Sequence, residues 1–334
     1  MFKNLILYTI APQWQGQFEP LAQALEAEPF AQCSPSQQKS AGWLPPRGHA
    51  HGALLEAVDG HWIARFAVET KSVPADAVRR KVQEEAERIE REQGRRPGKK
   101  ELRDMKEDAL QALLPQAFAR RASHWVWIDP QARLLAIDTG SQARADDITT
   151  SLLRVAGGQA NGLALALLHT ATSAQTAMTA WLGDESGQAL PEGFSIEREC
   201  ELKASGEEPA IVRFTRHPLQ IPEVRQHLRE GKLPTRLALD WQGRLGFVLT
   251  QALQIKKLRY ADGLFEQNPR PENRDEQFDA DAALATGELS RLLPPLIDAL
   301  GGLADPGQPA PTPASIPVPA PSTPAPDEDP GPPF

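Results

Sequence analysis

The residues best suited to chemistry in this chain are Lys and Arg side chains, which are concentrated in one stretch. Residues 73–121 contain thirteen of them, although the 334-residue chain has a net charge of −8. A local excess of cations on an acidic protein indicates that a polyanion is held at one defined place, not by general adhesion. The candidates for phosphate contact in this stretch are Arg80, Lys81, Arg88, Arg95, Arg96, Lys99 and Lys100.

The cations are densest where the sequence places no acid, between residues 93 and 100. A second basic group follows an apparent strand and also has no acid among its immediate neighbours: Lys256, Lys257 and Arg259. The alternative is a merely solvated helical arm, because opposite charges spaced i,i+4, such as Lys81 and Glu85, support an exposed helix. Both interpretations remain open at this point.

Motifs for catalysis are missing from the sequence, which has neither a glycine-rich phosphate loop nor a Gly-x-Ser-x-Gly elbow. Cys33 and Cys200 are far apart, which argues against a zinc or redox motif and fits a reduced cytosolic setting. Asp279 and Asp281 could hold a divalent cation for nuclease chemistry, or could be N-cap and first-turn acids of a helix. We expect no enzymatic activity and no cofactor, with a metal-dependent nuclease as the alternative.

The basic stretch is predicted to be an antiparallel helical hairpin over residues 73–121. Pro74 suits a helix start, and residues 94–98, Gly-Arg-Arg-Pro-Gly, interrupt the helical pattern. Each half has one narrow apolar stripe, so most of the hairpin surface should be solvated and the hairpin should project from the body. The stripes are Val78, Val82, Ala86 and Ile89, then Leu102, Met105, Ala109, Leu113 and Ala117.

The rest of the folded chain, residues 1–72 and 122–303, is predicted to be an α+β body with mixed antiparallel sheets, in two subdomains that divide near residues 170–190. Periodicity predicts strands at 2–10, 62–68, 124–128, 134–138 and 163–168, and two more within 194–217. It also predicts a hairpin of strands 237–241 and 244–250, joined by the turn Gln242-Gly243. It predicts helices at 18–28, 143–155, 173–181 and 221–230, and a helix over 277–300 interrupted by Gly287 and by Pro294-Pro295.

The two ends of the chain carry different expectations. Twelve of the last thirty residues are proline, so residues 304–334 are predicted to be an extended, disordered tail. A scaffold that acts through this tail, as the ligand of an aromatic-lined groove, is a further alternative function. At the start we expect no signal peptide, and no apolar run reaches the ~18 residues of a membrane span, so we expect no membrane partner.

Short motifs, in one order along residues 1–303, resemble the bacterial recombination-associated protein RdgC family. Each motif alone is weak, but together they are specific. They are Phe2-Lys3-Asn4-Leu5, Gly42-Trp43-Leu44-Pro45-Pro46, Leu113-Leu114-Pro115-Gln116-Ala117-Phe118, Trp127-Ile128-Asp129, Leu237-Ala238-Leu239-Asp240-Trp241-Gln242, Phe278-Asp279-Ala280-Asp281 and Thr286-Gly287-Glu288-Leu289.

The resemblance implies a cytoplasmic, nucleoid-associated protein that binds double-stranded DNA without marked sequence preference, with single-stranded DNA left open. It implies a homodimeric ring with a positively lined hole, a role in recombination and replication through restraint of RecA, and no catalysis or cofactor. Cations that face such a hole would reconcile an acidic exterior with phosphate-driven DNA binding.

The resemblance also implies two ring-closing contacts. Phe118 would insert an aromatic ring across the subunit contact, with an ordinary core aromatic as the alternative. A second contact corresponds to the strand around Arg213, Thr215, Arg216 and His217. Members of the family often have consecutive basic residues where this chain has Thr215-Arg216-His217. The chain also departs from the family in its proline-rich tail and in a start one or two residues shorter than usual.

Overall fold

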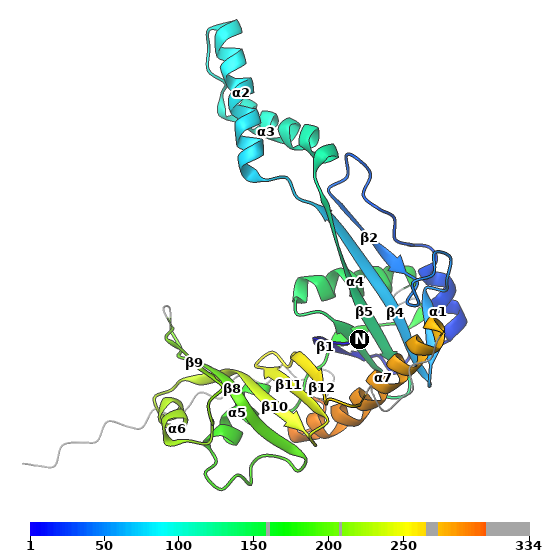
Figure 1. Cartoon of the computed structure of the whole chain (residues 1–334), viewed down its shortest axis with the longest axis vertical. Coiled ribbons are helices and arrows are strands. Elements are labelled where there is room, and N and C mark those ends of the chain that lie inside the picture. The colour runs from blue at the N-terminus through cyan, green and yellow to red at the C-terminus, as the bar shows by residue number, and fades with distance from the viewer. Residues whose placement is uncertain (158–160, 207–208, 265–272, 305–334) are drawn as a thin grey trace, which may run out of the picture.

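The computed structural model describes residues 1–157, 161–206, 209–264 and 273–304 of the chain. Within these ranges the fold is α+β and contains seven α-helices and one large antiparallel sheet (Figure 1). The prediction of an α+β fold is confirmed, but the expected separate sheets are one continuous sheet. The predicted proline-rich tail, residues 304–334, lies outside the described residues except for Ala304.

Twelve strands form the sheet in the order β2-β4-β5-β6-β1-β12-β11-β10-β8-β9, with β3 beside β4 and β7 beside β1. All the pairings are antiparallel. The strands are β1 (Leu5–Ile10), β2 (Lys39–Leu44), β3 (Leu55–Val58), β4 (His61–Lys71), β5 (Ala119–Asp129), β6 (Leu134–Asp138), β7 (Leu165–Leu167), β8 (Phe194–Lys203), β9 (Ile211–Thr215), β10 (Leu233–Trp241), β11 (Leu245–Thr250) and β12 (Ile255–Tyr260).

The helices cover the sheet or project from it. They are α1 (Phe18–Leu25), α2 (Ala75–Gln93), α3 (Lys99–Leu113), α4 (Gln142–Val155), α5 (Ala174–Gly183), α6 (Pro222–Arg229) and α7 (Arg274–Ala299), with a short 3-10 turn, η1 (Leu114–Gln116). The expected interruption of the last helix is wrong, because α7 continues through Gly287, Pro294 and Pro295. Proline lacks an amide donor, so α7 forgoes two helical hydrogen bonds there while its apolar side chains stay buried.

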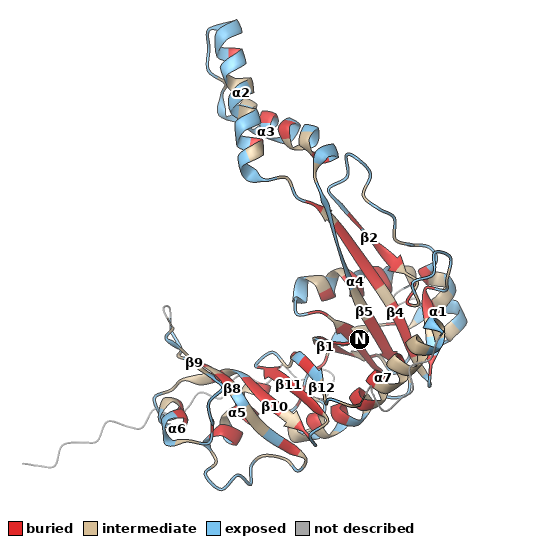
Figure 2. Cartoon of the chain, viewed as in Figure 1, coloured by how far each residue is buried: buried red, intermediate tan, exposed pale blue. Residues whose placement is uncertain are grey.

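Alternation along β4 shows how the sheet separates two hydrophobic clusters. Trp62, Phe66 and Val68 belong to a cluster that includes Leu21 and Leu25 of α1 and several residues of α4. Ile63, on the opposite face, belongs to a second cluster that contains the buried residues of α5, α6 and α7 and the inner residues of β8 to β12. Because successive side chains of a strand point to opposite faces, both faces are covered along most of β4 and the last four residues of β5, whereas the first five residues of β5 are exposed (Figure 2).

The helical pair α2 and α3 projects beyond the ends of β4 and β5, away from the rest of the molecule (Figure 1). Val78 and Ile89 of α2 and Met105 and Ala109 of α3 are buried, whereas the remaining surface is largely exposed (Figure 2). Figure 1 shows α3 at a steep angle to α2, so the predicted pair of helices is present but is not a simple antiparallel hairpin.

Candidate nucleic-acid interface

The tip of the projecting pair is shaped by two glycines. Gly94 ends α2 in the left-handed conformation, with φ 66°, which a residue without a β-carbon adopts at little cost. Gly98 then precedes α3, and its amide donates to Glu101 Oε2 at 3.4 Å. These residues join the end of α2 to the start of α3, within the part of the chain that projects from the body (Figure 1).

The arginines of the tip are paired with acids, contrary to what the local sequence suggests. Arg95 Nη1 lies 2.7 Å from Glu101 Oε2, and this hydrogen bond lowers the pKa of the Glu101 carboxyl. Arg96 Nε lies 3.0 Å from Glu90 Oε1. The acids come from the flanking helices, outside the acid-free interval, because the turn folds the chain back onto them.

Three candidate lysines stand apart from the paired arginines. Lys81, Lys99 and Lys100 are exposed, and none of them forms an ion pair with any residue that the structure describes. Arg80 and Arg88, by contrast, form ion pairs within α2, Arg80 with Glu84 and Arg88 with Glu85 and Glu92. Residues 75–113 hold eleven Lys or Arg and ten Asp or Glu, so the helical pair is nearly neutral overall. Its unpaired lysines are therefore the charges most available to a polyanion.

The second basic group lies on β12, far from the helical pair (Figure 1). Lys257 Nζ lies 2.5 Å from Glu199 Oε1, and Arg259 Nη2 lies 2.6 Å from Glu197 Oε2, both acids of β8. Lys256 Nζ donates to the carbonyl of Gly140 at 3.3 Å. The expectation of a basic group without nearby acids is wrong for Lys257 and Arg259, because folding brings β8 across the sheet.

A glycine explains how Arg259 reaches β8. β12 and β8 are separated by β11 and β10, and Gly246 of β11 lies directly opposite Arg259. A β-carbon at Gly246 would stand 2.8 Å from Arg259 Nη2 and 3.3 Å from Glu197 Oε1. The absence of a side chain at Gly246 therefore opens the path along which this ion pair crosses the sheet.

A candidate that the sequence pattern did not indicate is Arg65 of β4, which points away from the α1 and α4 side of the sheet. Its guanidinium lies 5.1 Å from the ring centroid of Trp125, and its Nη2 donates to Ser123 Oγ at 2.8 Å. Burial lowers the pKa of Arg65, and no described residue forms an ion pair with it. A single arginine in an apolar strand carries no recognisable sequence signal, so only the fold reveals it.

Phe118 is the most exposed large apolar residue of the described chain, with 95% of its surface accessible. It lies between η1 and β5, at the base of the helical pair, next to the exposed Arg120 and Arg121. The alternative that Phe118 is an ordinary core aromatic is wrong. An aromatic ring this exposed is unusual and marks a surface suited to contact with another molecule.

The second predicted contact region coincides with the edge strand β9, which pairs only with β8 among the described strands. Arg213 Nε donates to Glu201 Oε2 at 2.6 Å, and Thr215 lies opposite Glu199. Arg216 and His217 follow the strand and are exposed. The outer edge of β9 therefore presents backbone groups that another strand could pair with.

Asp279 and Asp281 do not form a metal site with their neighbours. Asp279 lies in the second turn of α7 and accepts from Arg47 Nη2 at 2.7 Å, while Asp281 accepts from Gln277 at 2.8 Å. The expectation of N-cap and first-turn acids is also wrong, because Asn273 caps α7. Among the described residues, no group of three or more His, Cys, Asp or Glu is placed to hold a metal ion. None of the described helices has the length and apolar character needed to span a bilayer.

Comparison with known proteins covers nearly all of the described chain. The family profile described as "Putative exonuclease, RdgC" matches residues 1–303. The "Recombination-associated protein RdgC" of Dechloromonas aromatica is 42% identical over 305 residues, covering 90% of this chain and 97% of that protein. The proteins of the same name from Janthinobacterium sp. and Burkholderia cenocepacia are each 38% identical, covering 90% and 93% of this chain and 98% of each relative. The chain therefore belongs to the RdgC family.

Proposed function

We propose that the chain is a non-enzymatic, sequence-independent binder of double-stranded DNA that forms a ring-shaped homodimer and takes part in recombination and replication by restraining RecA. This function places the protein in the cytoplasm, associated with the nucleoid. The observation that carries the proposal is the projecting pair of helices, which holds the unpaired cations Lys81, Lys99 and Lys100 away from the acidic surface of the body. The names of the relatives support the role in recombination.

Phosphate contact accounts for the distribution of charge. Sequence-specific binding needs several rigidly held side chains that reach the base edges within a DNA groove. Isolated lysines and arginines instead neutralise phosphates without regard to sequence. Lys81 on α2 and Lys99 and Lys100 at the start of α3 spread unpaired cations over the helical pair, and Arg65 adds a cation on the sheet. Single-stranded DNA offers the same phosphates and is a second possible ligand of these side chains.

The dimer explains the two unusual surfaces of the monomer. Phe118 leaves an aromatic ring in water unless a partner covers it, and burial of a phenylalanine side chain contributes about 1.5–3 kcal/mol. The exposed edge of β9, with Arg213, Thr215, Arg216 and His217 on or beside it, suits antiparallel pairing with a second copy. Two such contacts on one chain are what closure into a ring requires.

The proposal is tested by equilibrium binding to several duplexes of equal length and different sequence, across a salt series. We expect affinities that fall steeply with salt and differ between duplexes by less than about 1–3 kcal/mol, the discrimination from one good base contact. Incubation of the same duplexes with magnesium should leave them intact. Cleavage that disappears in Asp279→Ala would instead support the nuclease suggested by the family description. A strand-exchange assay in which the protein does not slow RecA would remove that part of the proposal.

A further inference from the structure

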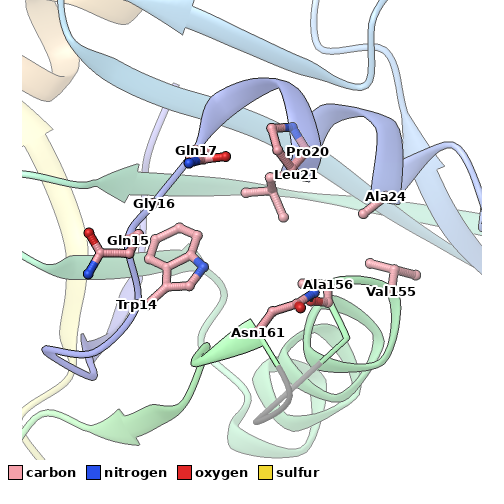
Figure 3. A pocket seen from close by; sticks show the side chains of 10 residues that line it. All are labelled: Trp14, Gln15, Gly16, Gln17, Pro20, Leu21, Ala24, Val155, Ala156 and Asn161. Atoms are coloured by element: carbon pink, nitrogen blue, oxygen red, sulfur yellow. The ribbon is translucent and has the colours of Figure 1, made fainter.

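A cavity of about 320 Å³ lies between the start of α1 and the end of α4, and neither the phosphate contacts nor the dimer contacts use it. Leu21 and Ala24 of α1 form one wall, and Val155 and Ala156 form the other (Figure 3). The ring of Trp14 closes one end (Figure 3). The cavity is thus a mostly apolar groove with an aromatic side chain at its mouth.

Trp14 is fixed in this position by its neighbours. Its ring packs edge-on against Trp62, with centroids 5.9 Å apart. Gly16, at φ 52°, turns the chain back so that a β-carbon there would touch the Trp14 ring at 3.5 Å. No described residue accepts a hydrogen bond from the indole N–H of Trp14, and Gln15 and Gln17 are exposed beside it. The groove therefore offers a rigid aromatic face together with side-chain donors.

The described chain ends beside the residues that follow β7, on the way to this groove. Leu303 forms an antiparallel bridge with Thr170, and the amide of Ala304 donates to the carbonyl of His169 at 3.0 Å. From His169 the chain runs back through β7 to Gly162, where a β-carbon would stand 3.1 Å from the carbonyl oxygen of Gln13, next to Trp14. The seven residue-to-residue steps from His169 back to Gly162 span at most about 23 Å at ~3.3 Å per step.

The composition of residues 305–334 suits such a groove. The apolar segment Ile316-Pro317-Val318-Pro319 begins twelve residues after Ala304, a reach of about 37 Å at the ~3.1 Å per residue of a polyproline II helix. Polyproline II segments dock in aromatic-lined grooves, where their backbone carbonyls accept hydrogen bonds from side chains.

Charge agrees with this occupant. The tail has four acids and no Lys or Arg. Arg133 donates to the carbonyls of Ala11 and of Trp14, a residue that lines the groove, and forms no ion pair with a described residue. Arg133 therefore offers a cation to the acids that flank the neutral segment 316–319 in the sequence, Asp305 before it and Asp327 after it.

The geometry points to intramolecular docking of the proline-rich segment around residues 316–319 in the groove formed by Trp14, Leu21, Ala24 and Val155. The family profile ends at residue 303, so this contact is specific to a chain that carries such a tail. It does not depend on the proposed DNA-binding function.

The test places a spin label on the tail of the full-length chain and observes the indole N–H signals of the tryptophans by NMR. The label is attached at Ala320→Cys in a Cys33→Ser background, because the buried thiol of Cys200 has a pKa raised to about 12 and should not react. We expect the Trp14 signal, assigned with Trp14→Phe, to lose most of its intensity. The signals of Trp181 and Trp241, buried in the second cluster, should be unaffected.

A blocking variant and its control decide the location of the contact. Ala24→Arg fills the groove and should restore the Trp14 signal, whereas Gln23→Arg, exposed on the same helix outside the groove, should not. An unaffected Trp14 signal in the labelled chain would overturn the proposal. A second experiment mixes isotope-labelled chains that carry no spin label with spin-labelled chains that carry no isotope label. Loss of the Trp14 signal in this mixture would also overturn the proposal, since the tail would then occupy the groove of a second copy.

Discussion

Replacing Lys99 and Lys100 together by glutamine should weaken duplex binding more than replacing Arg95 and Arg96. The two lysines form no ion pair with a described residue, whereas the two arginines are held by Glu101 and Glu90. An arginine that binds a phosphate must first leave its carboxylate, and the freed carboxylate attracts counterions in turn. The net release of counterions is therefore smaller than for an unpaired lysine. Each free lysine that contacts a phosphate contributes about 0.9 to the slope of log affinity against log salt.

The expected magnitude follows from the same slope. At about 0.1 M salt, each contact is worth about 1.2 kcal/mol, so losing both lysines should weaken binding by about 60-fold and reduce the slope by about 1.8. Fluorescence anisotropy with one labelled duplex over a salt series measures both quantities. Arg103→Gln, an exposed residue of the same helix paired with Glu107, is the matched control and should change little. A larger loss from the arginine pair would refute the reasoning, because it would show that the ion pairs open when DNA binds.

Three further predictions concern the dimer, stability and thiol chemistry. Phe118→Ala should raise the dimer dissociation constant by roughly 150-fold or more, because a homodimer loses two phenylalanine side chains whose burial contributes about 1.5–3 kcal/mol each. Sedimentation would measure this change, and calorimetry should show an unchanged thermal midpoint of the monomer. Unchanged dimerisation would contradict a role for Phe118. Arg244→Ala should lower the free energy of unfolding, measured in urea, by about 3–5 kcal/mol. Glu288 is 2% exposed and accepts a hydrogen bond from Arg244 Nε at 2.8 Å, so the substitution leaves a buried carboxylate without its main partner. Arg291→Ala, which removes the other ion pair of Glu288, should cost much less. The hydrogen bond from Arg244 lowers the pKa of Glu288 in the folded chain, so the stabilisation is complete above the unfolded pKa of about 4.3 and is lost as the pH falls through the folded pKa. If Arg244→Ala lowered the free energy of unfolding equally at pH 7 and at pH 3, this coupling between protonation and stability would be contradicted. Cys200 should resist thiol reagents at pH 8, because burial raises its thiol pKa to about 12; rapid labelling of the folded chain would contradict this.

Sequence periodicity predicted most of the elements because burial follows it. The stripe in residues 78–89 became the buried face of α2, and the alternating residues 62–68 became part of β4. Periodicity could not predict that α7 would continue through Pro294 and Pro295. The cost of the missing donors was overcome by burial of residues such as Leu293 and Leu296, which depends on the rest of the fold.

The candidate site was harder to predict than the fold. Counting charges along the sequence found the basic residues but not their partners, since Glu199 and Glu197 lie about sixty residues from Lys257 and Arg259. The exposure of Phe118 and the unpaired state of Arg65 are likewise properties of the folded surface. Ion pairs made by the folded chain, not local composition, determine which cations stay unpaired.

The measurement that tests the central claim most directly is release of the protein from a linear duplex with free ends and from the same duplex with both ends blocked. The two are compared at several salt concentrations. An enclosing ring predicts dissociation that is markedly slower from the blocked duplex, with steeply salt-dependent binding to both. Equal release from the two duplexes would contradict enclosure, and no binding at low salt would show that the helical pair is only a solvated arm.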